Sequence, residues 1–336
     1  MHLMIETERP RAWREAVLIV NTRSRRGRKL YAHAKVALAN HGVALSATYP
    51  VRDPGRLPEI VQGVVARGPV LVIVGGGDGT ISSIVDYFVG STATLAILPL
   101  GTANSFARTL TIPIDVEGAA DALVNGTVAA VDLGCIDGDL FANAASIGIS
   151  AAIGRSRPHQ LKRYLGRFGY LIAAARMLAT FKPFACRLTH EGRMVLDVAQ
   201  AVDVLIANGP YHGGMLVADE ADVESRDIVI RIIKGSSRWA LVSGWLRIWL
   251  HLPLGPHRLD VVRTKAVTLT TDPIRYVSID GEVVTKTPVH VSVARRALRV
   301  IVPATFVERS TPHPSEGNIR AGMLASNDGR EDPVSA

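Results

Sequence analysis

A run of three glycines followed by aspartate, glycine and threonine is the part of this sequence best suited to chemistry. Residues 75–80 (GGGDGT) follow an apolar run that ends at Val74, and a helical pattern begins at Ile81. Glycines let backbone amides approach an anion closely, and the start of a helix adds a favourable field. Asp78 would repel a bare phosphate, so its natural partner is phosphate-bound Mg²⁺. The loop predicts phosphate binding, and the competing interpretation is a tight turn in which Asp78 caps the helix.

Two further stretches carry groups that could join the first. Residues 98–104 (LPLGTAN) again follow an apolar run and open a helical pattern. If the two strands are neighbours in a parallel sheet, both loops meet in one crevice at its carboxyl edge. Far downstream, residues 280–282 (DGE) fit either a two-residue hairpin turn or a carboxylate placed to accept a proton. The usual nucleotide signatures are absent, since there is no G-x-x-x-x-G-K-[ST] and Thr80 stands where G-x-G-x-x-G needs its last glycine.

The elements that would position these loops follow one pattern up to residue 127. Short apolar runs alternate there with helical patterns. Strands are expected at 16–20, 43–48, 70–74 and 95–98, helices at 29–40, 57–67 and from 81 onward, and a basic loop at 21–28. This alternation predicts parallel βαβ units with helices on both faces of the sheet. An α/β domain with a parallel sheet is therefore expected over residues 1–127.

From about residue 128 the pattern changes, because turn signals of the Asp-Gly and Glu-Gly type join one apolar run to the next. Strands are expected at 128–136, 140–147, 184–188, 194–198, 202–207, 228–233, 267–271, 276–279, 289–293 and 298–302. Adjacent strands joined by turns predict an antiparallel sandwich or barrel, interrupted by helical patterns at 160–180 and 238–250. We expect this second domain over residues 128–307, followed by a disordered polar tail at 308–336.

Composition places this chain of 336 residues and 36.0 kDa among folded proteins with anionic partners. Hydrophobic residues make up 48% and charged residues 20%, and the formal net charge is +8. A basic balance favours phosphates, nucleic acid or an acidic membrane surface, but no motif beyond charge supports nucleic acid. The two cysteines, Cys135 and Cys186, lie far apart, which excludes a disulfide framework and a thiolate zinc site and fits a reducing compartment.

No segment indicates secretion or a membrane span. Residues 1–8 lack the apolar stretch of a signal peptide. Residues 239–254 are apolar, but they are too short to cross a bilayer and are interrupted by Arg247 and His251. We therefore expect a cytoplasmic protein, with peripheral contact at the inner face of the membrane as one option.

Taken together, these motifs resemble the diacylglycerol kinase catalytic family, which includes bacterial lipid kinases and sphingosine kinases. The matching segments stand in the family's order at 76–80, 99–108 and 280–282, with weaker matches at 21–27, 48, 141–149 and 208–215. The glycine motif alone is shared with NAD kinases. Its combination with the later Asp-Gly-Glu is specific.

The resemblance implies an α/β nucleotide-binding domain, an antiparallel β-sandwich domain and a cleft between them that holds ATP. It implies an ATP- and Mg²⁺-dependent kinase that phosphorylates a hydroxyl of diacylglycerol or a related lipid at a membrane surface. Glu282 matches the family's general base, and Asp78 is implied as a catalytic residue and as a ligand of the Mg²⁺ that accompanies ATP. The residues implied to contact the nucleotide are Asn21, Arg23, Thr48, Gly76, Gly77, Asp78, Gly79, Thr80, Gly101 and Thr102.

Three acidic positions of the fullest family pattern are serines in this chain. Ser82-Ser83 replace Asn-Glu, Ser105 replaces an Asp after the second loop, and Ser225 replaces an Asp that helps to hold a structural Mg²⁺. The serine at 225 puts that structural metal in doubt, and the carboxylates that could substitute are Asp222, Glu224 and Asp227. Two alternatives stay open: an NAD kinase-like enzyme, and a catalytically weakened nucleotide- or lipid-binding regulator on the same fold.

Basic and aromatic stretches fit more than one role. The basic cluster after the first strand fits either polyphosphate contact or a solvated loop, and comprises Arg23, Arg25, Arg26, Arg28 and Lys29. Trp245 and Trp249 beside Arg247 fit a membrane interface, although such a stripe is more often part of a core. His212 stands in a Tyr-His-Gly-Gly turn, where a structural role is favoured over a catalytic one. The oligomeric state stays open, a homodimer included.

Overall fold

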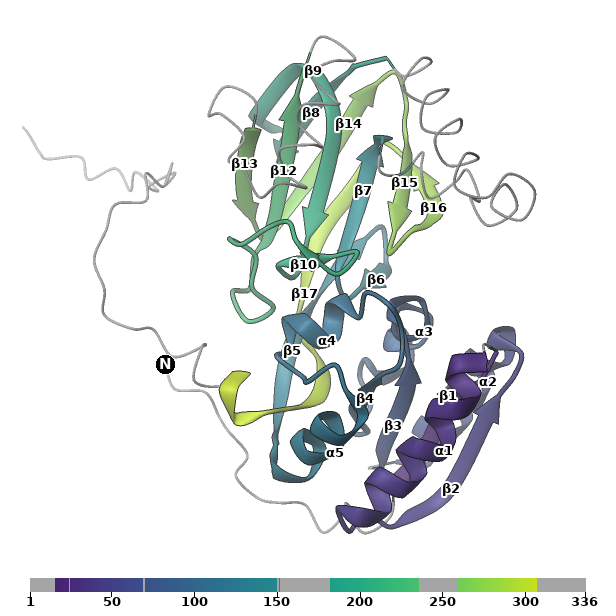
Figure 1. The fold of residues 1–336 in the computed structure, drawn as a ribbon. Helices are drawn as coiled ribbons and strands as arrows, with labels where there is room; N and C mark the ends of the chain where they lie inside the picture. Colours follow the sequence, from purple (N-terminus) through teal and green to yellow (C-terminus); the bar gives the residue numbers. More distant parts are fainter. Residues whose placement is uncertain are drawn as a thin grey trace, which may run out of the picture.

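The structure is a computed structural model that describes residues 16–23, 25–68, 70–149, 151, 182–235 and 259–306. Figure 1 shows two parts, a lower α/β part and an upper part made of strands. The helices predicted at 160–180 and 238–250, with the tryptophans of the second, lie outside the described residues. So does the predicted tail at 308–336.

The lower part is built on a parallel sheet, as the alternation of apolar runs predicted. Its strands are β1 (Ala16–Asn21), β2 (Leu45–Val51), β3 (Leu71–Gly76) and β4 (Thr94–Pro99). They lie in the order β2-β1-β3-β4, and every neighbouring pair is parallel. Strands β1, β3 and β4 are buried along almost their whole length, because helices cover both faces of a parallel sheet.

Helices flank this sheet in the arrangement that right-handed crossovers require. Helix α1 (Arg25–Asn40) contacts α5 (Val116–Asn125), and both lie in front of the sheet in Figure 1. The shorter elements are η2 (Pro54–Arg56), α2 (Leu57–Val65), α3 (Asp78–Ser82), η3 (Val85–Phe88) and α4 (Ser105–Thr109). The predicted basic loop at 21–28 was wrong in its second half, because α1 begins at Arg25 and arginine is a good helix former.

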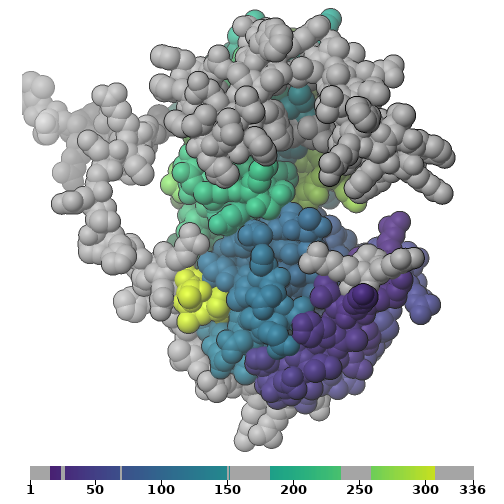
Figure 2. All heavy atoms as spheres, in the orientation of Figure 1, coloured from purple at the N-terminus to yellow at the C-terminus, as the bar shows by residue number. Residues whose placement is uncertain are grey.

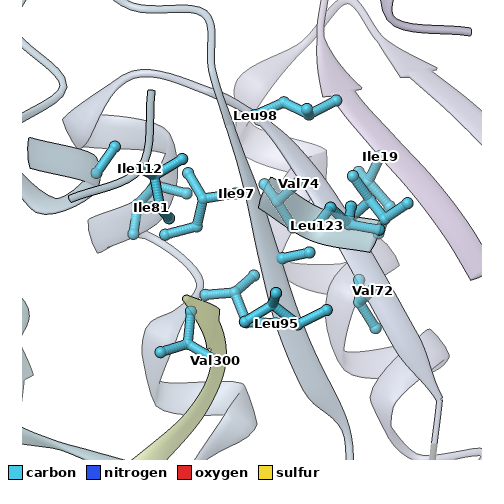
Figure 3. Packing of buried hydrophobic residues seen from close by; sticks show 14 of the residues in the cluster. Ile19, Val72, Val74, Ile81, Leu95, Ile97, Leu98, Ile112, Leu123 and Val300 are labelled. Carbon is cyan, nitrogen blue, oxygen red and sulfur yellow. The ribbon is translucent and has the colours of Figure 1, made fainter. Parts of the chain in front are cut away.

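Aliphatic side chains from strands and helices interlock in the core of the lower part. Figure 3 shows Ile19 of β1, Val74 of β3 and Ile97 of β4 packed together with side chains from the helices. Val300 reaches the same cluster from a strand near the end of the chain. The last described strand therefore stabilises the first domain as well as the second.

The upper part consists of antiparallel strands, two of which are longer than the others and pair with several neighbours. They are β5 (Thr127–Ile136), β6 (Asp139–Phe141), β7 (Ala144–Gly148), β8 (Phe184–His190), β9 (Arg193–Ala207), β10 (Tyr211–His212), β11 (Met215–Leu216), β12 (Ile228–Lys234), β13 (Leu259–Thr264), β14 (Ala266–Asp272), β15 (Tyr276–Ile279), β16 (Glu282–Lys286) and β17 (Val289–Val302). One half of β9 pairs with β8, and the other half pairs with β7 and β12. This shared strand gives a sandwich-like arrangement, so the predicted fold class is confirmed.

Two pairs of predicted strands are in fact single strands. The runs at 194–198 and 202–207 form β9 without a break, and those at 289–293 and 298–302 form β17. A register shift in the pairing of β17 with β5 lies between Ala294 and Leu298, where the apolar pattern is interrupted. A bulge of this kind lets a strand change direction without ending it, so the sequence pattern alone looked like two strands.

Strands β5 and β17 join the two parts. One half of β17 pairs with β14 and the other reaches β4 of the parallel sheet, while β5 follows it along both halves. In Figure 2 the green segment of the second part rests directly on the blue segment of the first. The boundary predicted between residues 127 and 128 stays a prediction, and residues 129–133 and 298–306 contribute to the first hydrophobic core.

Candidate active site between the two domains

The two glycine-containing loops meet at the carboxyl ends of β3 and β4, as expected for neighbouring parallel strands. A Cβ atom on Gly101 would lie 2.4 Å from the Cα atom of Gly77, and one on Gly77 would lie 2.9 Å from the Cα atom of Gly101. Only glycine at both positions allows this approach of one backbone to the other. Helix α3 begins at Asp78, not at the predicted Ile81, so the acidic residue occupies the first turn of the helix.

Replacing Gly101 by alanine is expected to separate the two loops. The new Cβ would meet backbone atoms that cannot move aside cheaply, so we expect a loss of about 1–3 kcal/mol in the free energy of unfolding and weaker nucleotide binding. The matched control is Gly63→Ala in α2, where a Cβ meets nothing within 4 Å and where alanine favours the helix. Thermal unfolding of both variants checks this, and an unchanged melting temperature in Gly101→Ala would contradict it.

Asn104 and Phe106 fix the second loop against the first. Asn104 adopts a left-handed conformation with φ of 49°, and its Oδ1 accepts a hydrogen bond of 2.9 Å from the amide of Gly101. The amide of Phe106 donates to Oδ1 of Asp78 over 3.3 Å. Asp78 is thus half-buried between the two loops, with one carboxylate oxygen held by the start of α4.

The other predicted nucleotide contacts lie along the same edge of the sheet. Nδ2 of Asn21 donates to Oγ1 of Thr80 over 3.1 Å, which ties the end of β1 to α3. Thr48 accepts a hydrogen bond of 3.1 Å from the hydroxyl of Tyr31. Beside Thr48 is a cavity of about 400 Å³, whose lining includes Tyr49, Val51, Arg52, Arg56 and Ile60. Arg23, Gly79 and Thr102 are exposed at this edge.

The second domain contributes a buried carboxyl group, Asp280, to the contact between the two domains. The backbone of Asp280 is partly exposed in its turn, but its side chain is buried, and Oδ1 accepts a hydrogen bond of 3.3 Å from the amide of Ala144. The pKa of Asp280 is raised to about 6, chiefly by burial and in smaller part by the charge of Asp78, against the lowering effect of hydrogen bonds from Ala144, Ser82 and Asn143. Because Ser82 belongs to α3, this carboxyl group lies where the two domains meet.

The raised pKa of Asp280 predicts a pH-dependent cost to stability. The folded protein holds this proton up to a higher pH than the unfolded chain, so stability falls as pH rises from 3.8 to about 6. Ionisation would cost about 3 kcal/mol at neutral pH, from 1.36 kcal/mol per pKa unit. We therefore expect Asp280→Asn to be more stable than wild type at about pH 8 and to lose this advantage at about pH 4. Urea unfolding at both pH values measures it, and a difference that does not change with pH would contradict it.

His212 and the glycine turn that follows it border the site from the second domain. The amide of Gly214, after the β10 strand, donates to Oγ of Ser105 over 3.0 Å and so links the second domain to α4. His212 lies near Asp78, whose charge raises the pKa of the histidine, while the larger effect of burial lowers it below its ordinary value. The sequence singled out His212 but gave no indication that it faces Asp78.

Glu282 is the first residue of β16 and is exposed at the tip of the β15–β16 hairpin. Asp280 and Gly281 form the turn, with φ values of 45° and 93°, so the hairpin interpretation of this motif is confirmed. This turn is compatible with Glu282 acting as a general base, because Glu282 lies two residues after Asp280, whose carboxyl group contacts Ser82. The catalytic roles of Glu282 and Asp78 stay predictions.

The serines that depart from the family pattern all make hydrogen bonds. Ser83 donates to the carbonyl of Thr80 over 2.9 Å, and Ser225 donates to the carbonyl of Asp222 over 2.8 Å. Ser82 and Ser105 bridge the domains, as described above. These short side chains thus fill structural roles without adding charge, Ser82 and Ser105 where the domains meet and Ser225 within a loop of the second domain.

Comparison with known proteins agrees with this geometry. Residues 15–136 match the model of the diacylglycerol kinase catalytic domain, and residues 143–302 match that of the YegS C-terminal NAD kinase beta sandwich-like domain. An Enterobacter protein named "Probable lipid kinase YegS-like" is 33% identical over 205 residues, covering 60% of this chain and 67% of that protein. The chain belongs to the diacylglycerol kinase catalytic-domain family. It is therefore a lipid kinase, a phosphotransferase whose acceptor is an alcohol group.

Other relatives extend the similarity over more of the lipid kinase. The diacylglycerol kinase of Bacillus subtilis is 27% identical over 246 residues, covering 71% of this chain and 80% of the relative. The crystal structure of a diacylglycerol kinase from Bacillus anthracis superimposes with a TM-score of 0.68 at 20% identity, covering 88% of this chain and 99% of that one. This likeness shows the fold. Within the described part of the lipid kinase, no helix is long and apolar enough to cross a membrane.

Proposed function

We propose that this lipid kinase transfers the γ-phosphoryl group of Mg²⁺-bound ATP to a hydroxyl of diacylglycerol or a related lipid, with Glu282 as the general base. The observation that supports it most strongly is the meeting of three motifs where the two domains touch. The two glycine loops touch through Gly77 and Gly101, and the charge of Asp78 reaches Asp280 at the start of the Asp-Gly-Glu turn.

The loops fit a nucleotide as the donor substrate. Close backbone contact at Gly77 and Gly101 admits no side chain between the two loops. The amides of Gly101 and Phe106 are already held by Asn104 and Asp78. Exposed Gly79 and Thr102 offer an amide and a hydroxyl to phosphate oxygens. The cavity beside Thr48 lies at the end of β2 and offers apolar side chains, two arginines and Asp53 to the rest of the nucleotide.

The donor set fits a magnesium ion held chiefly by the substrate's phosphates. Among the residues that the structure describes, no group of three or more His, Cys, Asp or Glu side chains could hold a metal. Mg²⁺ in kinases commonly uses one or two carboxylates together with phosphate oxygens and water. Asp78 is the half-buried carboxylate of the glycine loop, and only its Oδ1 is engaged by Phe106. When bound, Mg²⁺ would neutralise the charge that develops on the transferred group.

Glu282 would accept the proton of the lipid hydroxyl. As that proton leaves, the hydroxyl oxygen bonds to the γ-phosphorus and the bond from phosphorus to the bridging oxygen of ADP breaks. A general base acts within about 2.6–3.2 Å of the hydroxyl oxygen, so the rigid two-residue turn serves to hold Glu282 in place. Asp280 anchors that turn through its hydrogen bond with the amide of Ala144.

The buried carboxylate that contacts the loop of Ser225, Asp132, is held by protein donors. Both carboxylate oxygens of buried Asp132 accept backbone hydrogen bonds, 2.9 Å from the amide of Arg226 and 2.7 Å from that of Arg296. Ser225 itself bonds the carbonyl of Asp222. Protein donors thus satisfy the acidic group that joins this loop to β17, and we assign no metal there.

The test is transfer of label from γ-labelled ATP to diacylglycerol in mixed micelles. We expect labelled phosphatidic acid with Mg²⁺, none after chelation with EDTA, and recovery when excess Mg²⁺ is restored. Label on NAD instead of lipid would favour the NAD kinase-like alternative. Bound ATP with no labelled product would favour the catalytically weakened regulator, the alternative that the three serine replacements suggest.

A further inference from the structure

The hairpin that carries Glu282 exposes apolar side chains beside the cleft. Strand β16 is the edge strand of the sheet, and its described partner is β15. The large hydrophobic residues exposed on this hairpin are Ile274 at 65%, Tyr276 at 41%, Val283 at 36% and Val284 at 44%. Exposed apolar residues gathered on one element mark an interaction surface more often than scattered ones do.

The pairing of the two strands places Tyr276, Val283 and Lys286 on one face, together with Ser278, which is buried. Tyr276 lies opposite Lys286 and Ser278 lies opposite Val283, and residues that face each other across an antiparallel pair point to the same side. A register shift between Val277 and Ser278 accommodates Val284 as an extra residue of β16. Val277, in contrast, is buried on the opposite face within the core of the second domain.

Basic side chains border this apolar face. Nζ of Lys286 lies 4.9 Å from the ring centroid of Tyr276. At the base of the hairpin, the guanidinium of Arg275 donates to the carbonyl of exposed Lys182 over 2.7 Å and lies over Phe184. The same segment also carries two exposed acidic residues, Asp272 and Glu282. Apolar residues flanked by lysine and by an aromatic ring suit the interface of an anionic bilayer.

We propose that this face of the β15–β16 hairpin, formed by Tyr276, Val283 and Lys286 with exposed Ile274 and Val284 beside it, docks on an anionic lipid bilayer. The inference rests on the proposed function, because a lipid acceptor lies within a bilayer. Docking through this hairpin would bring the bilayer surface next to Glu282 at its tip. The net charge of +8 on the chain supports an anionic surface over a neutral one.

The test is sedimentation with vesicles made of equal parts phosphatidylcholine and phosphatidylglycerol. The triple variant Ile274→Ser/Tyr276→Ser/Val284→Ser is expected to lower the partition coefficient at least about tenfold, since it removes most of the apolar area that would be buried. Lys286→Ala is expected to lower it about fivefold on these vesicles and not on pure phosphatidylcholine. The matched control is Val36→Ser/Met194→Ser, which removes exposed apolar residues elsewhere and should bind as wild type does.

Activity separates this inference from the proposed function. The triple variant should lose turnover of vesicle-embedded diacylglycerol and keep turnover of a monomeric short-chain diacylglycerol. If wild type phosphorylates no lipid, the proposed function fails, but sedimentation still decides the docking.

Three results would overturn the docking. The first is a triple variant that binds vesicles as wild type does. The second is a lowered melting temperature in that variant, which would mean that the chain itself covers the face. The third is light scattering that gives a dimer for wild type and a monomer for the triple variant, because the face would then be a subunit interface.

Discussion

Replacing Glu282 by glutamine is expected to lower kcat for lipid phosphorylation by about 10²–10⁴-fold, the usual contribution of a general base. Glutamine keeps the size and polarity of the side chain but cannot accept the proton of the hydroxyl. Glu282 is exposed at the tip of its hairpin, so the melting temperature and ATP affinity should stay as in wild type. Steady-state kinetics with micellar diacylglycerol and titration of a fluorescent ATP analogue measure both quantities.

The matched control is Glu191→Gln, which changes an exposed glutamate in the turn of the β8–β9 hairpin of the same domain. This variant should keep wild-type kcat. An unchanged kcat in Glu282→Gln would show that another group accepts the proton. Equal losses in the two variants would show that the effect comes from surface charge and not from position.

Replacing Asp78 by asparagine is expected to lower kcat by about 10²–10⁴-fold, because the charge that would help to hold Mg²⁺ is lost and such an ion contributes several kcal/mol. Oδ1 of asparagine can still accept the hydrogen bond from the amide of Phe106, so the two loops should stay together. The Mg²⁺ concentration for half-maximal activity should rise. Kinetics over a Mg²⁺ titration measure both effects.

A second observation distinguishes loss of charge at Asp78 from local distortion. The charge of Asp78 raises the pKa of Asp280 and that of His212, so both pKa values should fall in Asp78→Asn. NMR titration of the His212 ring reports this directly. An unmoved His212 titration together with full activity would contradict the placement of Asp78 at the centre of the site.

The fold of the first domain could be predicted from the sequence because its signals are local. Each buried strand is a continuous apolar run, and each is followed by a helical pattern or a glycine loop. Neighbouring parallel strands present their loops at one edge, so the contact of Gly77 with Gly101 followed from topology. Helix starts were less accurate, since Arg25 and Asp78 are as compatible with a loop as with a first helical turn.

The second domain was predicted less completely because the order of its strands in the sheet depends on pairing between residues far apart in the sequence. Strands β9 and β17 change partners along their length, and this change cannot be read from either strand's own residues. The edge strand β16 carries only weak apolar signal, since its first three residues are exposed. The Asp-Gly dipeptide correctly predicted the turn that precedes it.

The candidate site was predicted in its motifs but not in its contacts. The sequence does not identify the partners of Ser82 and Ser105 in the second domain, because those partners stand far away along the chain. The burial of Asp280 was also missed, since the same dipeptide is usually solvated in a hairpin. A serine at each bridging position beside a glycine loop is the one signal that could have indicated these contacts.

The most direct test of the account follows the fate of the γ-phosphoryl group in one reaction. Labelled ATP and Mg²⁺ are supplied with vesicles that contain diacylglycerol, with NAD present in solution, to wild type, Asp78→Asn and Glu282→Gln. We expect wild type to place label on lipid alone, and both variants to lose this product while still binding ATP. Label on NAD, or undiminished lipid labelling by either variant, would contradict it.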